Sequence, residues 1–100
     1  MAKSAVEWEV GADVSFDEPK RYSVVMLNDD YTTMEFVVEV LMRVFHKSQE
    51  QAMALMQTIH QKGRAVCGIF PYEIAETKAL QVRKMAKANS FPLRCIVEEA

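Results

Sequence analysis

The hydrophobic pattern of residues 21 to 100 changes its period several times, and each change coincides with a turn or a helix-capping signal. Residues 22 to 27 (YSVVML) are aromatic and β-branched, which is typical of a strand, and the Asn-Asp-Asp cluster at 28 to 30 then favours a turn. Thr32 and Glu35 follow at the spacing of a capping box, in which a hydroxyl and a carboxylate satisfy free amides at a helix start. The pattern therefore predicts a strand, a polar turn and a helix in immediate succession.

The rest of the chain predicts two more helices and two more strands. Ser48 and Gln51 repeat the capping spacing, Gly63 is placed to end that helix, and Pro71 marks the start of another. The predicted elements are a strand at 22–27, a helix at about 33–46, a helix between Ser48 and Gly63, a strand at 65–70, a helix from 72 to about 88 and a strand at 93–97. This order, βααβαβ, predicts an α+β fold in which three helices cover one face of a small three-stranded sheet.

Composition limits the chain to one small domain, since 100 residues cannot comfortably hold two cores. Residues 1 to 20 carry five acidic residues and two lysines without a sustained period, so we predict a flexible N-terminal tail at 1–20 and a single folded domain at 21–100. A formal net charge of -2 gives no bulk attraction to nucleic acid or to an anionic membrane, and we expect neither as a partner.

Few of the parts needed for catalysis or metal binding are visible. Cys67, Cys95, His46 and His60 show no spacing typical of metal ligands, and the three glycines form no phosphate-binding loop or nucleophile elbow. Both cysteines lie in apolar runs, which suits buried thiols in a reducing compartment. We therefore expect a cytoplasmic protein that holds no metal or cofactor, and most kinds of catalysis lack the residues that they need.

The polar cluster at 28 to 30 is the strongest candidate site, because three polar side chains converge between a strand and a capped helix. A structural role is also open, since Asx residues form turns and acidic residues favour the positive end of a helix. His60 lies in helical register with Met56 and Ile59, and it too can be a half-buried structural residue. The residues alone leave both interpretations open.

Three segments together, VVMLNDDYTTMEFVVEVL, MQTIHQKGRAVCGIF and EIAETKALQV, closely resemble the ClpS adaptor family of the bacterial N-end rule pathway. The resemblance covers about residues 21 to 100. It implies an adaptor, and not an enzyme, that binds the free α-amino group and bulky hydrophobic first residue (Leu, Phe, Tyr or Trp) of a substrate. It also implies delivery to the N-terminal domain of the ClpA unfoldase of the ClpAP protease, or of a ClpC-like relative, by a monomeric adaptor.

The resemblance also implies roles for individual residues. The positions that match the residues around the substrate's α-amino group are Asn28, Asp29, Asp30 and His60. The positions that match the lining of the hydrophobic pocket are Thr32, Met34, Val37, Met56, Ile59 and Leu93. The positions that match the unfoldase-docking surface are Glu73, Thr77 and Lys78. Which aspartate makes the direct contact is left open. Thr33 departs from the family, because relatives often have Pro at this position.

Two other classes of protein stay open. A small hydrolase built on Asp30 and His60 would need a positioned nucleophile and an oxyanion donor, and neither is visible. An RNA-binding sheet would show exposed aromatic side chains on its strands, whereas Tyr22 and Phe70 lie only at strand edges.

Overall fold

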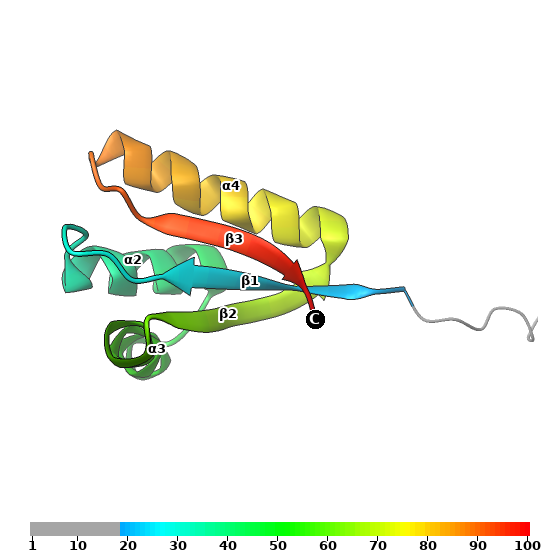
Figure 1. The fold of residues 1–100 in the computed structure, drawn as a ribbon, viewed down its shortest axis with the longest axis horizontal. Helices are drawn as coiled ribbons and strands as arrows, with labels where there is room; N and C mark the ends of the chain where they lie inside the picture. Colours follow the sequence, from blue (N-terminus) through cyan, green and yellow to red (C-terminus); the bar gives the residue numbers. More distant parts are fainter. Residues whose placement is uncertain (1–18) are drawn as a thin grey trace, which may run out of the picture.

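Strands and helices follow one another in the predicted order along the chain (Figure 1). The structure is a computed structural model that describes residues 19–100, so the predicted tail falls almost entirely outside the described residues and stays a prediction. The elements are β1 (Arg21–Leu27), α2 (Met34–Phe45), α3 (Gln49–Lys62), β2 (Arg64–Pro71), α4 (Tyr72–Ala88) and β3 (Arg94–Glu99). Each predicted element is present, with ends that differ by at most two residues.

The three strands form one antiparallel sheet in the order β2-β1-β3, with β1 in the centre. A β-bulge interrupts the β1–β2 pairing between Val24 and Val25. All three described helices lie on the same face of the sheet (Figure 1). The predicted α+β fold, with helices covering one face of a three-stranded sheet, is therefore confirmed.

The hydrophobic core lies between the sheet and the helices. Val24 and Met26 point from β1 into this layer and are fully buried, as the side-chain alternation of a strand requires. They pack in one cluster with fully buried apolar residues of the helices, including Leu41 of α2 and Val82 of α4. Burial of this apolar surface holds the helices against the sheet and fixes the relative positions of α2 and α3.

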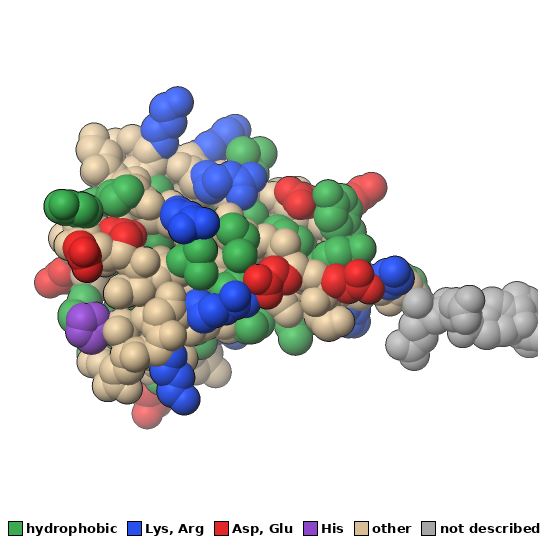
Figure 2. Space-filling model, viewed as in Figure 1, with side chains coloured by type: hydrophobic (Ala, Val, Ile, Leu, Met, Phe, Trp, Pro, Cys, Tyr) green, Lys and Arg blue, Asp and Glu red, His purple; other side chains and the backbone are tan. Residues whose placement is uncertain are grey.

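The other face of the sheet has no described helix over it and is shown in Figure 2. Val66 and Ile69 of β2 are 45% and 48% exposed there, and Figure 2 shows hydrophobic side chains interspersed with charged ones on this face. Arg64 of β2 lies beside the end of β1, and Glu98 of β3 lies beside the start of β1. The Arg64 guanidinium and the Glu98 carboxylate are 2.5 Å apart, so this ion pair crosses over β1. The crossing explains why Val25, on the same face, is fully buried.

The helix ends test the capping predictions. The capping box of Ser48 and Gln51 is present, and Gly63 ends α3 with a left-handed φ of 90°, so both predictions are confirmed. The prediction that Thr32 caps α2 is wrong: Thr33 is the N-cap, and its side chain accepts a hydrogen bond from the Phe36 amide at 3.2 Å. The helix begins one residue later than the spacing indicates because Thr32 bonds to the preceding loop.

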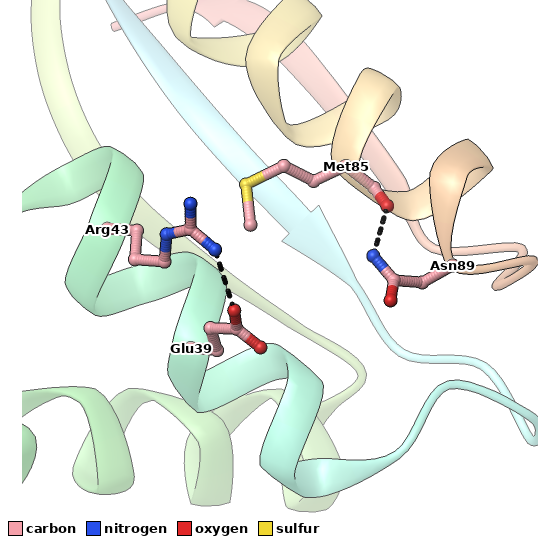
Figure 3. A network of polar contacts seen from close by, with 4 residues as sticks. All are labelled: Glu39, Arg43, Met85 and Asn89. Carbon is pink, nitrogen blue, oxygen red and sulfur yellow. Dashed lines mark hydrogen bonds and ion pairs between the residues drawn. The ribbon is translucent and has the colours of Figure 1, made fainter.

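Polar contacts on the helix surfaces support the ends of α2 and α4 (Figure 3). Glu39 accepts a hydrogen bond from Arg43 one turn later on α2, at 2.8 Å. The Asn89 side chain donates to the Met85 carbonyl at the end of α4, at 2.9 Å. Such exposed contacts contribute roughly a few tenths of a kcal/mol each to stability. The hydrophobic core therefore contributes most of the stability of the fold.

Both cysteines are free and buried, as predicted. Burial, together with the nearby Cys95, raises the pKa of the Cys67 thiol to about 12. Burial likewise raises the pKa of Cys95 to about 11, and Arg83 only partly offsets the effect. Both thiols are therefore protonated at neutral pH, a form that is a poor nucleophile.

Candidate functional site

A cavity of about 230 Å³ lies where the loop after β1 meets α2 and α3. Its lining consists of Asn28, Asp29, Asp30, Thr32, Met34, Val37, Met56, Ile59 and His60. The nine lining residues include all four that we expected around an α-amino group. The other five are among the six that we expected in the hydrophobic pocket. Leu93, the sixth, does not line this cavity; it is buried in the hydrophobic core.

A hydrogen bond between distant parts of the chain joins two of the segments beside the cavity. The amide of Asn28 donates to the carbonyl of Gly63 at 2.9 Å, and the amide of Gly63 donates to Ile59 at the same distance. The end of β1 is thereby tied to the last turn of α3, next to His60. Sequence reasoning missed this role of Gly63, because its helix-ending signal says nothing about a partner 35 positions earlier.

Asp29 is used inside the loop. One carboxylate oxygen accepts hydrogen bonds from the amides of Tyr31 and Thr32, at 2.8 and 2.7 Å, and the other accepts from the Thr32 hydroxyl at 2.8 Å. Partial burial alone raises the pKa of Asp29, but these hydrogen bonds outweigh it and hold the pKa below its usual value of 3.8. Asp29 is therefore a loop-stabilising carboxylate, ionised at neutral pH.

Asn28, Asp30 and His60 differ from Asp29, because within residues 19–100 their side chains make no hydrogen bond to another residue. All three side chains belong to exposed residues at the mouth of the cavity. An amide oxygen, a carboxylate and an imidazole nitrogen can each accept a hydrogen bond. The mouth thus presents acceptors that the protein itself leaves free.

The inner wall of the cavity is apolar. Val37 of α2 and Met56 and Ile59 of α3 are buried residues whose side chains reach both the core and the cavity. Met34 lies in the first turn of α2 and is largely exposed at the edge. Such a hollow can bury a large apolar group, which contributes about 1.5 to 3 kcal/mol.

The lining offers little for a hydrolase. None of its nine residues is Ser or Cys, and the Thr32 hydroxyl donates to Asp29. Within residues 19–100, no group of three or more His, Cys, Asp or Glu residues is placed to hold a metal ion. None of the described helices has the length and apolar character needed to cross a membrane.

The residues predicted to dock on an unfoldase lie on α4, away from the cavity lining. Glu73 and Thr77 are exposed and one turn apart, so they share a face of the helix. Lys78 is only half exposed: its ammonium donates to the Val44 carbonyl at the end of α2, at 2.7 Å, and lies 5.8 Å from the Phe70 ring centroid. The Lys78 ammonium thus helps to hold α4 against α2.

An apolar cavity with free acceptors at its mouth defines a binding module for a ligand that has a bulky apolar group beside a cation. Comparison with known proteins leads to a family of this kind. Residues 17–96 match the family model of "ATP-dependent Clp protease adaptor protein ClpS". The chain therefore belongs to the ClpS family, whose members are adaptors of the ATP-dependent Clp protease.

Relatives from several bacteria agree with this assignment. The chain is 51% identical to the ClpS adapter protein of Wolinella succinogenes over 96% of this chain and 94% of that protein. It is 57% identical to the one from Neisseria gonorrhoeae over 81% of this chain and 78% of that protein. Among solved structures, that of Agrobacterium tumefaciens ClpS2 bound to L-phenylalaninamide matches with a TM-score of 0.81 and 42% identity. The match covers 83% of this chain and all of that one.

Proposed function

We propose that this protein binds the free α-amino group and the bulky hydrophobic side chain of a substrate's first residue (Leu, Phe, Tyr or Trp). It then delivers the substrate to the ClpA unfoldase of the ClpAP protease. The observation that carries the proposal is the cavity, which is apolar inside and has three free acceptors at its mouth. An α-ammonium group has three N–H donors and a positive charge, so it matches three converging acceptors.

In this proposal Asp30, not Asp29, contacts the α-amino group directly. The oxygens of Asp29 already accept three hydrogen bonds from its own loop. Asp30 has an exposed carboxylate with no such partner among the described residues, and it lies at the mouth together with Asn28 and His60. Asp29 then acts indirectly, by holding the loop that positions Asp30.

The relative from Agrobacterium supports the proposal through the chemistry of its ligand. L-phenylalaninamide has a free α-amino group and a phenylalanine side chain beside an amide, as the first residue of a polypeptide does. The same combination fits the cavity of this chain, with the side chain against Val37 and Ile59 and the amine at the mouth.

Binding is tested by fluorescence anisotropy with labelled peptides that differ only at the first residue or its amine. A free Leu-initiated peptide is expected to bind, and its acetylated form is expected to bind well over tenfold more weakly. Acetylation removes the charge and donors of charge-assisted hydrogen bonds worth about 1.5 to 3 kcal/mol each. A Ser-initiated peptide is the control for the apolar contact. Equal binding of the free and acetylated Leu peptides would contradict the proposal.

Delivery is proposed to use Glu73, Thr77 and Lys78 of α4, together with the N-terminal segment. Deleting residues 1 to 17 is expected to leave peptide affinity unchanged, because all cavity residues lie beyond the deletion. The deletion is expected to slow degradation of a Leu-initiated substrate by purified ClpAP. Degradation at the full-length rate would refute a role for this segment. If the protein stimulates a ClpC-type protease and not ClpAP, its partner is the ClpC-like unfoldase.

We propose that the protein acts as a monomer in the cytoplasm and acts by binding, not by catalysis. Free buried thiols are the form that a reducing compartment maintains. Sedimentation measures the oligomeric state, and incubation of the purified protein with ester and peptide substrates measures hydrolysis. A dimer at micromolar concentration, or hydrolysis that His60→Ala removes, would contradict these two statements.

A further inference from the structure

An apolar groove continues from the cavity along the space between α2 and α3. It has a volume of about 350 Å³ and is lined by Met34, Glu35, Val38, Gln49, Met53 and Met56. Met34 and Met56 also line the cavity, so the two hollows share a wall. A ligand that fills the cavity therefore has the groove directly beside it.

The groove has the chemistry of a surface that accepts apolar groups. Met34 and Met53 are 44% and 46% exposed, and they line the same groove as Val38 and Met56, so their apolar surfaces form one patch. Methionine is flexible and polarisable, so it adapts to apolar groups of different shapes. Glu35 is the sole charged residue in this lining, which disfavours a carboxylate in the groove.

The spacing along α3 indicates which part of a bound polypeptide reaches the groove. His60, Met56 and Met53 lie on one face of α3, at intervals of four and three residues. The seven positions from His60 to Met53 correspond to roughly 10 Å along the helix axis. An extended chain advances ~3.3 Å per residue, so its third residue lies roughly 7 Å beyond its first. For a chain that runs along α3 from an amine near His60 towards Met53, the third residue therefore lies between the levels of Met56 and Met53.

The alternation of side chains in an extended chain agrees with this distance. Successive side chains point to opposite sides, so the first and third face the same surface and the second faces away. When the first side chain enters the cavity, the third therefore faces the groove, while the second points to solvent.

We propose that the groove binds the side chain of the third residue of a polypeptide whose first residue occupies the cavity, and prefers a large apolar side chain there. This inference rests on the proposed function, since it places the first residue by the same amine contact. It adds a second specificity site to the adaptor, formed by Met53 and Val38.

The test measures affinity for three labelled peptides that begin Leu-Ala-Ala, Leu-Leu-Ala and Leu-Ala-Leu. Leucine at the third position is expected to strengthen binding about fivefold, the equivalent of ~1 kcal/mol, because the open groove buries only part of the side chain. Leucine at the second position is expected to change affinity less than twofold. Met53→Gln keeps helix propensity and length but removes the apolar contact, and it is expected to abolish the gain.

Two variants serve as controls. Met53→Leu keeps an apolar side chain and is expected to retain the gain. Met42→Gln changes a methionine of α2 that is 39% exposed but lines neither hollow, and it is also expected to retain the gain.

The outcomes separate this inference from the proposed function. If leucine at the second position strengthens binding and Met53→Gln removes this gain, the second residue and not the third faces the groove. If the gain from leucine at the third position survives Met53→Gln, the third side chain does not bind in the groove. In both cases the Leu-Ala-Ala peptide still distinguishes a free from an acetylated amine. Loss of that distinction identifies failure of the proposed function.

Discussion

The starts of α2 and α3 carry similar polar signals in the sequence but use them differently. At α3, Ser48 accepts from the Gln51 amide at 3.1 Å and Gln51 accepts from the Ser48 amide at 3.0 Å. The two side chains satisfy each other's backbone groups. At α2, Asp29 accepts from the Thr32 amide and Thr33 accepts from the Phe36 amide. The side chains of Asn28 and Asp30 make no hydrogen bond to another residue within residues 19–100. A candidate binding site is thus recognised by polar groups in excess of what the turn and the cap consume.

The comparison also separates stability from binding within one loop. Asp29 and Asp30 are adjacent in sequence and chemically identical, yet only Asp29 has hydrogen-bond partners among residues 19–100. Removing Asp29 is therefore expected to affect the fold, and removing Asp30 to affect only the ligand. The following predictions test that division, from the largest expected effect to the smallest.

Asp30→Ala is expected to weaken binding of a Leu-initiated peptide by more than tenfold, because a charge-assisted hydrogen bond contributes about 1.5 to 3 kcal/mol. The free energy of unfolding in urea is expected to change by less than about 0.5 kcal/mol. Glu50→Ala, which removes an exposed acid from the first turn of α3, is the matched control and is expected to leave affinity unchanged. Similar losses in both variants would mean that only the overall negative charge matters.

Asp29→Ala is expected to lower the free energy of unfolding by about 1 to 2 kcal/mol, because two amides and a hydroxyl lose a charged acceptor. Affinity for the peptide is expected to fall as well, since the loop no longer positions Asp30. Urea unfolding measures the first effect and anisotropy the second. An unchanged urea midpoint would show that the loop is held by other contacts.

The stabilisation from Asp29 is expected to depend on pH in one direction. Its folded-state pKa lies below the usual 3.8, so the contribution is fully present above that value and is lost as pH falls through the folded pKa. The difference in unfolding free energy between the native protein and Asp29→Ala is therefore constant from about pH 7 to 5 and shrinks below about pH 4. A difference that is undiminished at pH 2 would contradict the assignment to the ionised carboxylate.

Ser48→Ala is expected to cost about 1 kcal/mol of stability, which is typical for loss of an N-cap, and to change peptide affinity less than twofold. This variant is the converse of Asp30→Ala, because it removes a polar group that the fold consumes entirely. A clear loss of affinity would show that the start of α3 is coupled to the cavity.

The smallest effect is expected at the opposite end of α2. His46 ends this helix in the left-handed region with a φ of 57°, where a side chain is strained and glycine is not. His46→Gly is expected to raise the free energy of unfolding by about 0.5 kcal/mol without changing affinity. A lower urea midpoint would show that the histidine side chain makes a contribution of its own.

Much of the fold follows from interactions between residues close together in the chain. The capping box at Ser48 and the glycine that ends α3 were predicted from spacing because each involves partners within four positions. The order of elements follows from changes in hydrophobic period, which local residues also set. The resemblance to the family pointed to nine residues that the structure gathers around one cavity.

Other features depend on competition between neighbouring local hydrogen bonds, or on contacts between residues far apart in the chain. Thr33, and not Thr32, caps α2 because the Thr32 amide and hydroxyl are taken by Asp29. Lys78 reaches the Val44 carbonyl, 34 positions earlier, only because α4 packs beside α2. Leu93 lies in the core because β3 is directed to the edge of the sheet beside β1.

The sequence by itself determined the elements, their order and the chemistry available in the loop between β1 and α2. The folded loop shows which of its two adjacent aspartates makes hydrogen bonds within it, and the tertiary structure decided that the loop lies beside His60. The physical reason is that the Asn28–Gly63 hydrogen bond and the packing of α2 on α3 join segments far apart in the sequence. Such contacts form only when the chain is folded, so no local pattern records them.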